Sequence, residues 1–257
     1  MGFRELRYEV TDGVAVITLN RPAVMNALSS VLRRELLAAI ARAEREARVI
    51  VLTGAGRGFC SGQDLGDVDL STLDLEAVLR EEYEPLLMAI ANSPLPVIAA
   101  VNGVAVGAGA NLALGCDVVI AAESASFIQA FTRIGLVPDA GGSYWLPRQV
   151  GLARSMGAML FAEPVTAAQA ADWGMIWQAV PDAAFESVWR GKAGVLAKGP
   201  GLAYSGVKRA LRASFDNDLT AQLALEARLQ GECGASADFR EGVAAFLGKR
   251  KPRFLGT

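Results

Sequence analysis

Residues 97–142 read VIAAVNGVAVGAGANLALGCDVVIAAESASFIQAFTRIGLVPDAGG, and this stretch decides the fold that we predict. Two of its segments, Val97 to Val101 and Asp117 to Ala121, show the apolar pattern of buried, parallel strands. Between them lies a helical segment that begins in a run of glycine and alanine. The order strand, turn, helix, strand indicates an α/β fold.

The run of small residues from Gly103 to Ala110 exposes the backbone itself. Few of its side chains are larger than a methyl group, so peptide N–H groups at the start of the next helix can approach a bound anion. Backbone amides in this arrangement can hold a developing negative charge. The pattern therefore predicts an oxyanion hole.

A second tight turn, Val137 to Gly142, carries one carboxylate. Pro138 fixes the backbone before Asp139, and the glycine pair that follows lets the next helix begin close by. An aspartate on a rigid elbow is suited to moving protons, and we predict Asp139 as the catalytic residue. Its alternative role is that of a helix N-cap, which aspartate after a turn often fills.

The composition excludes several kinds of site. The chain of 257 residues has no histidine, which excludes Ser-His-Asp and Cys-His nucleophile systems and the usual zinc and haem ligands. Cys60, Cys116 and Cys233 form no C-x-x-C pair, so we expect neither a disulfide framework nor a metal site. Cys60 lies in an apolar stretch and is expected to be a small buried residue rather than a nucleophile.

Partners and location follow from charge and hydropathy. A net charge of −2 and dispersed basic residues argue against nucleic-acid binding. No apolar run reaches the roughly 18 residues that span a bilayer, and the first residues lack the apolar core of a signal peptide. We expect a soluble, cytoplasmic protein without a membrane partner.

The N-terminal segments predict a hairpin followed by an amphipathic helix. Asp12-Gly13 lies between two β-branched segments, which is a strong hairpin signal. A helix capped by Ser29 or Ser30 then extends to about Ala47, with Arg33 among the residues placed on its solvent face.

The second half of the chain changes character. Strands and helices alternate through about residue 180, and helices dominate from about Asp182 onward. We predict a core with the active site at residues 1–195 and a helical oligomerisation region at residues 196–257. Apolar helix faces in the second region exceed what a small appendage can bury, and they include Leu223, Leu225, Leu229, Val243, Phe246 and Leu247.

Five segments carry a family resemblance: Asn20 to Pro22, Met25 to Leu28, Leu52 to Leu65, Ala100 to Gly103 and Ala113 to Asp117. In this order they are similar to the enoyl-CoA hydratase/isomerase (crotonase) superfamily, over essentially the whole chain. Further segments resemble the branch of 1,2-epoxyphenylacetyl-CoA isomerases, which act in phenylacetate degradation: 56–65, 104–114, 173–178 and 236–242.

The resemblance implies a crotonase-like spiral of ββα turns with a C-terminal helical trimerisation region, assembled as a homotrimer or a dimer of trimers. It implies an acyl-CoA thioester as substrate, with coenzyme A as part of the substrate and no separate cofactor. The thioester oxygen would lie between the backbone N–H groups of Gln63 and Ala108. The CoA-binding loop would comprise Ser61, Gly62, Gln63, Asp64 and Leu65.

The sequence departs from the hydratases of this superfamily at two positions. Hydratases activate water with two glutamates, and this chain has Asn111 and Phe131 at those positions. Asp139 corresponds to the acid of the isomerases, and the dehalogenase branch needs a histidine that is missing here. The resemblance therefore implies an isomerase that converts ring-1,2-epoxyphenylacetyl-CoA to oxepin-CoA and shifts Δ3 double bonds to Δ2 through an enolate.

Alternatives remain for the enzyme and for single residues. The chain could be a general Δ3,Δ2-enoyl-CoA isomerase or a hydratase of fatty-acid oxidation, or a catalytically silent acyl-CoA-binding member. Phe131, Tyr144 and Trp145 are candidates for the acyl pocket, although a core role is as plausible for the last two. The side chain of Asp64 is expected to be structural, and Asp117 to be a cap or a buried hydrogen-bond acceptor.

Overall fold

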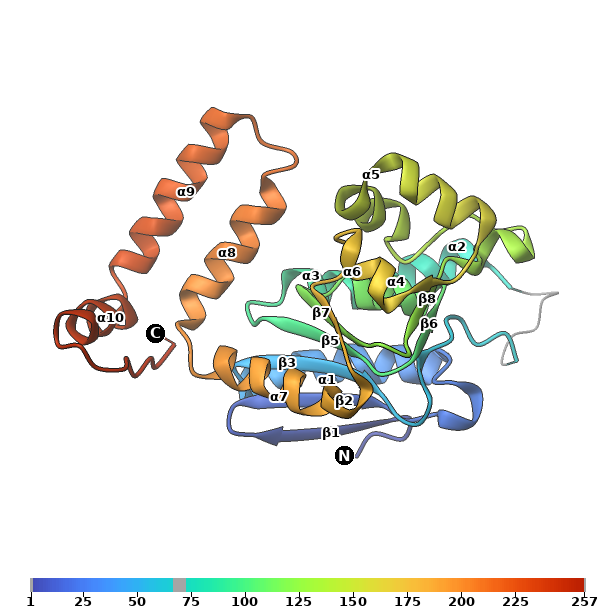
Figure 1. Ribbon diagram of the computed structural model, residues 1–257, viewed down its shortest axis with the longest axis horizontal. Helices are drawn as coiled ribbons and strands as arrows, with labels where there is room; N and C mark the ends of the chain where they lie inside the picture. Colours follow the sequence, from blue (N-terminus) through green and yellow to red (C-terminus); the bar gives the residue numbers. More distant parts are fainter. Residues whose placement is uncertain (1, 67–72, 257) are drawn as a thin grey trace.

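The computed structural model describes residues 2–66 and 73–256, and the strands within these residues form two sheets (Figure 1). The larger sheet has six strands in the order β1-β2-β3-β5-β7-β10, and the smaller has four in the order β4-β6-β8-β9. The strands are β1 (Leu6–Thr11), β2 (Val14–Leu19), β3 (Val49–Gly54), β4 (Gly58–Cys60), β5 (Val97–Val101), β6 (Val104–Val106), β7 (Val118–Ala122), β8 (Ser126–Ile128), β9 (Val165–Thr166) and β10 (Gln178–Val180).

Successive pairs of strands place one strand in each sheet. β3 lies in the larger sheet and β4 in the smaller, and the pairs β5 and β6, then β7 and β8, repeat this arrangement. Helical segments follow each pair before the chain returns to the larger sheet. The repetition builds a spiral, which confirms the predicted α/β fold of crotonase-like ββα turns.

The helical segments divide between the spiral and the C-terminal region. The short ones are the 3₁₀ segments η1 (Pro22–Val24) and η3 (Ala130–Ile134) and the π-helical η2 (Leu79–Tyr83). The α-helices are α1 (Ser30–Glu46), α2 (Leu75–Val78), α3 (Glu84–Asn92), α4 (Ala108–Leu114), α5 (Gly142–Phe161), α6 (Ala167–Asp172), α7 (Asp182–Ala197), α8 (Gly201–Ala213), α9 (Leu219–Gly234) and α10 (Ala237–Leu247).

The larger sheet is buried on both faces, which explains the continuous apolar pattern of β3. Val49 and Val51 pack in one hydrophobic cluster with Trp189 of α7. Ile50 and Leu52 point to the opposite face and belong to the main core, which includes residues of α1, α3 and α4. Since successive side chains of a strand alternate between faces, both faces need apolar residues here.

Local sequence signals set the N-terminal elements as predicted. Asp12 and Gly13 have φ values of 51° and 78°, the left-handed pair of a type I′ turn, and β1 and β2 are antiparallel. The Ser29 side chain accepts a hydrogen bond from the N–H of Leu32, which caps α1. The remaining strand pairs of the larger sheet are parallel.

Helices α8, α9 and α10 lie together to one side of the sheets (Figure 1). Asp117, just before β7, attaches α8 to the core: it forms ion pairs with Lys208 at 2.7 Å and Arg212 at 2.8 Å. Its carboxylate also accepts the N–H of Val97, in line with the expected buried acceptor. The division predicted between residues 195 and 196 stays a prediction, and it falls in the last turn of α7.

No helix within the described part of the chain is long and apolar enough to cross a membrane.

The prediction that Arg33 faces solvent is wrong, because this side chain is 2% exposed. Arg33 lies on the same face of α1 as the core residues Leu36 and Ile40, at helical spacing. Its guanidinium pairs with Glu82 of η2 at 2.7 Å, and it donates to the Leu28 carbonyl oxygen at 2.5 Å. A counter-charge from a distant segment thus allows the cation to be buried.

Replacing Arg33 with Met is expected to lower the free energy of unfolding by about 2–4 kcal/mol, because Glu82 and the Leu28 carbonyl lose their partner. Urea unfolding of both proteins measures the difference. Arg34→Met is the matched control, since Arg34 is the next residue of α1 and is exposed; its loss should stay within about 0.5 kcal/mol. Equal stability of the two variants would contradict the burial argument.

Candidate active site

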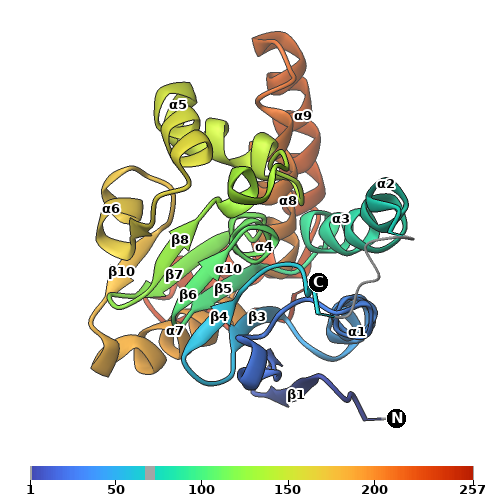
Figure 2. The same cartoon turned by 90° about the vertical axis from the view of Figure 1, so that its right-hand side faces the viewer.

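The predicted site residues follow three neighbouring strands of the smaller sheet (Figure 2). β4 pairs in parallel with β6, and β6 pairs in parallel with β8. Gln63 comes after β4, Ala108 after β6 and Phe131 after β8. Parallel strands end at the same edge of their sheet, where α/β proteins bind ligands. The topology therefore gathers residues that lie far apart in the sequence.

The turn after β4 and the turn after β6 meet at Gly62. This residue has a φ of 90°, and a Cβ atom on it would lie 2.8 Å from the Val106 carbonyl oxygen and 3.5 Å from the Ala108 amide nitrogen. A larger residue would collide with the β6 turn, so glycine allows the two backbones to approach each other. The amides of Gln63 and Ala108, predicted to form the oxyanion hole, are thereby brought onto adjoining backbone segments.

The directions of these two amides follow from local hydrogen bonding. Leu28 forms a parallel bridge with Gln63, in which the Leu28 N–H donates to the Gly62 carbonyl and the Asp64 N–H donates to the Leu28 carbonyl. In such a bridge the N–H of Gln63 itself points away from Leu28. Ala108 is the first residue of α4, and the first amides of a helix have no acceptor within it. Both N–H groups are therefore left for another acceptor.

The expected CoA-binding loop is tied to the β2–α1 connection. The Ser61 N–H donates to the Met25 carbonyl at 2.9 Å. The Asp64 carboxylate pairs with Arg21 at 2.6 Å, so its side chain is structural, as expected. Leu65 is 51% exposed at the end of the loop. The loop thus offers a fixed backbone with an apolar side chain at the surface.

The Gln63 side chain is held by two residues that the sequence did not indicate. Its Oε1 accepts hydrogen bonds from the Tyr83 hydroxyl at 2.5 Å and from Arg33 at 2.9 Å. Burial is the main reason that the pKa of the Tyr83 phenol is raised, and the Asp139 carboxylate adds to it. Tyr83 therefore lies within electrostatic reach of Asp139. It is positioned by the π-helical turn of η2, which single-residue patterns do not reveal.

Asp139 lies on the elbow between η3 and α5, and it is not the N-cap of α5. That position is taken by Gly141, with a φ of 78° and no side-chain cap. The Oδ1 atom of Asp139 is enclosed and accepts no hydrogen bond from any described residue. Burial raises the pKa of Asp139 from 3.8 to about 6. A carboxyl group of this kind can accept and return a proton near neutral pH.

Asn111 and Phe131, at the positions where the resemblance implies glutamates in hydratases, have side chains that do not titrate. Asn111 of α4 is fully buried, and its Nδ2 donates to the main-chain carbonyl of Asp139 at 2.8 Å. Phe131 of η3 is 7% exposed, and its ring lies 3.6 Å from the point where Gly107 would carry a Cβ. Phe131 thus forms an apolar wall beside the turn that carries the Ala108 amide, consistent with a place in the acyl pocket.

Tyr144 and Trp145 belong to the first turn of α5, just after the elbow, and the Trp145 indole nitrogen lies 2.7 Å from the point where Gly141 would carry a Cβ. The Arg148 guanidinium carbon is 3.7 Å from the centre of the Tyr144 ring, which is 38% exposed. The Trp145 indole nitrogen lies 3.3 Å from the point where Gly115 would carry a Cβ. Gly115 follows the end of α4, opposite to Ala108. These contacts favour a role in packing for both residues, which was the alternative to a place in the acyl pocket.

Two other chemistries find no support. Cys60 is fully buried, which raises its thiol pKa to about 12, so it is not poised as a nucleophile. Within residues 2–66 and 73–256, no group of three or more Asp, Glu or Cys side chains is arranged to hold a metal ion.

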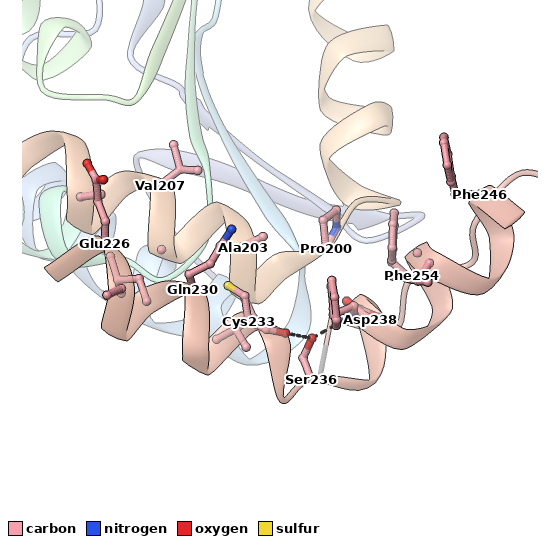
Figure 3. A pocket seen from close by; sticks show the side chains of 18 of the residues that line it. Pro200, Ala203, Val207, Glu226, Gln230, Cys233, Ser236, Asp238, Phe246 and Phe254 are labelled. Atoms are coloured by element: carbon pink, nitrogen blue, oxygen red, sulfur yellow. Dashed lines mark hydrogen bonds between the residues drawn. The ribbon is translucent and has the colours of Figure 1, made fainter. Parts of the chain in front are cut away.

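A large cavity of about 860 Å³ lies away from this site, between α8, α9 and α10 (Figure 3). Its lining is mainly apolar and includes Val207, Phe246 and Phe254. None of the predicted site residues lines it. Because the cavity lacks both the predicted carboxyl group of Asp139 and the predicted oxyanion amides, we do not assign catalysis to it.

Comparison with known proteins agrees with the geometry. The enoyl-CoA hydratase/isomerase family model matches residues 9–257. The chain is 66% identical over 256 residues to a probable enoyl-CoA hydratase of Rhodobacter capsulatus, covering 100% of both chains. It is 46% identical to the 1,2-epoxyphenylacetyl-CoA isomerase of Escherichia coli K12, covering 96% of this chain and 97% of the relative.

A solved structure supports the same assignment. The crystal structure of a putative enoyl-CoA hydratase/isomerase from Mycobacterium abscessus superposes with a TM-score of 0.92 at 40% identity, covering 98% of this chain and 100% of the other. The spiral of two sheets, the glycine turns and these similarities lead to one conclusion: the chain belongs to the enoyl-CoA hydratase/isomerase (crotonase) family and is an enzyme acting on CoA thioesters.

Proposed function

We propose that this enzyme isomerises acyl-CoA thioesters and that Asp139 carries the proton. The observation that supports this most directly is the environment of Asp139: an enclosed carboxyl oxygen without a partner among the described residues and a pKa near 6. Asn111 and Phe131 stand where hydratases have their glutamates, so the site lacks the carboxylate pair that activates water. This favours isomerisation even though the relative of 66% identity is named a probable enoyl-CoA hydratase.

The proposed reaction moves a double bond from Δ3 to Δ2. The Asp139 carboxylate takes a proton from C2, and the electrons of the broken C–H bond form an enolate on the thioester. The N–H groups of Gln63 and Ala108 hold the enolate oxygen, and each such donor contributes roughly 3 kcal/mol in comparable sites. Asp139 then returns the proton to C4, which leaves the double bond between C2 and C3. The loop from Ser61 to Leu65 binds coenzyme A.

We also propose ring-1,2-epoxyphenylacetyl-CoA as a substrate, rearranged to the seven-membered oxepin-CoA. This finer assignment is supported by the 46% identity to an enzyme named 1,2-epoxyphenylacetyl-CoA isomerase. The apolar ring of Phe131 beside the Ala108 turn suits an aromatic acyl group. No redox cofactor is needed, because substrate and product are isomers.

Asp139→Asn is expected to slow isomerisation of trans-3-hexenoyl-CoA by about 100-fold or more, because the amide cannot carry the proton. Binding of hexanoyl-CoA, measured by calorimetry, should stay within about threefold, since the backbone contacts remain. The control is Asp172→Asn, which changes an exposed aspartate at the end of α6. More than about a tenth of wild-type activity in Asp139→Asn would refute its role. Faster hydration of 2-hexenoyl-CoA than isomerisation by the wild type would favour the hydratase alternative.

The raised pKa of Asp139 also predicts a dependence of stability on pH. Above about pH 6 the folded protein must hold an ionised, half-buried carboxyl group, whereas well below pH 3.8 the group is protonated in both the folded and unfolded states. Asp139→Asn should therefore unfold with about 1–2 kcal/mol more free energy than the wild type near pH 8, after allowance for partial exposure. Urea unfolding should show this difference shrink as the pH falls through 6 and vanish about one pH unit below 3.8. A variant less stable than the wild type near pH 8 would contradict the burial cost.

We further propose that α8, α9 and α10 assemble the protein into a trimer or a dimer of trimers. Phe246 is 82% exposed, Leu247 74% and Leu223 54%, and all three line the cavity of Figure 3. Apolar side chains grouped in this way mark association surfaces. Sedimentation velocity at micromolar concentration should show trimers or hexamers, and Phe246→Glu should shift them toward monomer. A monomeric wild type would rule out this assembly.

A further inference from the structure

Asn111 and Gln129 form a buried chain of two amides that ends on the Asp139 backbone. Asn111 is fully buried and Gln129 is 2% exposed. Gln129, between β8 and η3, donates from Nε2 to Oδ1 of Asn111 at 2.8 Å. Asn111 donates from Nδ2 to the Asp139 carbonyl oxygen at 2.8 Å. The chain therefore joins the end of β8, the middle of α4 and the catalytic elbow.

The orientation of both amides is fixed from the elbow end. A main-chain carbonyl can only accept a hydrogen bond, so Asn111 must present its NH₂ group to Asp139. Its oxygen then faces Gln129, which must present its own NH₂ group in turn. Turning either amide around would place two acceptors or two donors against each other.

The chain acts on a turn that is strained and tightly packed. Ala140 has a φ of 49° and Gly141 one of 78°, so two successive residues are left-handed, and alanine adopts this conformation at a cost. The Asp139 carbonyl also accepts the Gly142 N–H at 2.9 Å. A Cβ atom on Gly142 would overlap the Asn111 amide group. Asn111 is thus in contact with the elbow on both sides of its left-handed residues.

Stability alone does not account for Gln129. Its Oε1 is enclosed and has no hydrogen-bond partner among the described residues. Burying an unpaired amide oxygen costs free energy, which a single hydrogen bond to Asn111 offsets only in part. A methionine of similar size would fill the same space without that cost.

We propose that Asn111, oriented by Gln129, is a positioning residue for Asp139. Both amides are buried, and the partners that the structure gives them are each other and the main chain of Asp139 rather than its carboxyl group. Asn111 holds the peptide that follows the Asp139 Cα atom, and this fixes the direction in which the carboxyl group enters the site. The inference rests on the proposed function of Asp139.

The experiment compares Asn111→Leu and Gln129→Met with a matched control, Gln149→Met. Gln149 of α5 also donates from Nε2 to a main-chain carbonyl, that of Leu114, and also has an enclosed Oε1 without a partner among the described residues. It contacts the opposite end of α4 and not the elbow. Three quantities are measured: kcat and KM with trans-3-hexenoyl-CoA, the Kd of hexanoyl-CoA, and the thermal unfolding temperature.

We expect kcat to fall by about 10- to 100-fold in Asn111→Leu and by about 3- to 10-fold in Gln129→Met, because the carboxyl group loses its fixed direction. KM and the Kd of hexanoyl-CoA should change by less than about threefold, since the CoA loop and the oxyanion amides are untouched. Gln129→Met should unfold at the same or a higher temperature than the wild type, and Gln149→Met should keep its kcat. Slower turnover without lost stability separates positioning from a structural role.

Two results would overturn the inference. One is a kcat within about twofold of the wild type in the folded variants, and the other is an equal loss in Gln149→Met. If Asn111→Leu does not fold, Gln129→Met decides alone. Asp139→Asn in the same assay separates the two proposals: an active Asp139→Asn refutes the proposed function, whereas an inactive one beside fully active amide variants refutes only the positioning role.

Discussion

The site depends on the close approach of backbones at glycine. Gly62 lies against the β6 turn, and a Cβ atom on Gly109 would lie 2.5 Å from the Cys60 carbonyl oxygen. Gly62 thus joins the turn after β4 to the turn after β6, and Gly109 joins α4 to the last residue of β4, so neither turn can shift without the other. The predicted oxyanion amides of Gln63 and Ala108 are therefore held by packing of main chain on main chain. Such a contact is more rigid than one made by long side chains, which is what preorganised donors require.

Around this rigid pair the molecule places groups that lower its own stability. Asp139 is half-buried, its enclosed oxygen has no hydrogen-bond partner among the described residues, and Ala140 is left-handed. Arg33, by contrast, is buried with Glu82 and several acceptors, so its charge is compensated. The difference has a functional meaning: a compensated charge fixes the loop of Gln63, whereas an uncompensated carboxyl group keeps a pKa close to neutral. Stability thus favours a paired charge, as at Arg33, whereas the proposed proton transfer favours an unpaired one, as at Asp139.

Local sequence patterns predicted most of the fold and part of the candidate site. The Asp12-Gly13 turn, the apolar strand β5 and the glycine run before α4 depend on neighbours in the sequence, and the structure has them where we predicted. The family resemblance supplied the spiral. The sequence did not predict the buried roles of Arg33 and Tyr83, because these roles depend on partners about 50 residues away. The partner of Arg33 is Glu82, and that of Tyr83 is Arg33. No helical period distinguishes a buried arginine with a partner from an exposed one without it.

The side chains of Asn111, Gln129 and Phe131 explain why the elbow suits Asp139 as the single proposed proton carrier. A carboxylate at position 111 would turn an acceptor toward the Asp139 carbonyl and add a second negative charge beside Asp139, whereas the amide of Asn111 donates and stays neutral. Gln129 extends this neutral chain to the end of β8, and Phe131 next to it is apolar. The three side chains leave Asp139 as the titrating group of the elbow. A site with one such acid can take a proton from one carbon and return it to another, which the proposed isomerisation requires. At the two positions where the resemblance implies carboxylates in hydratases, Asn111 and Phe131 supply none.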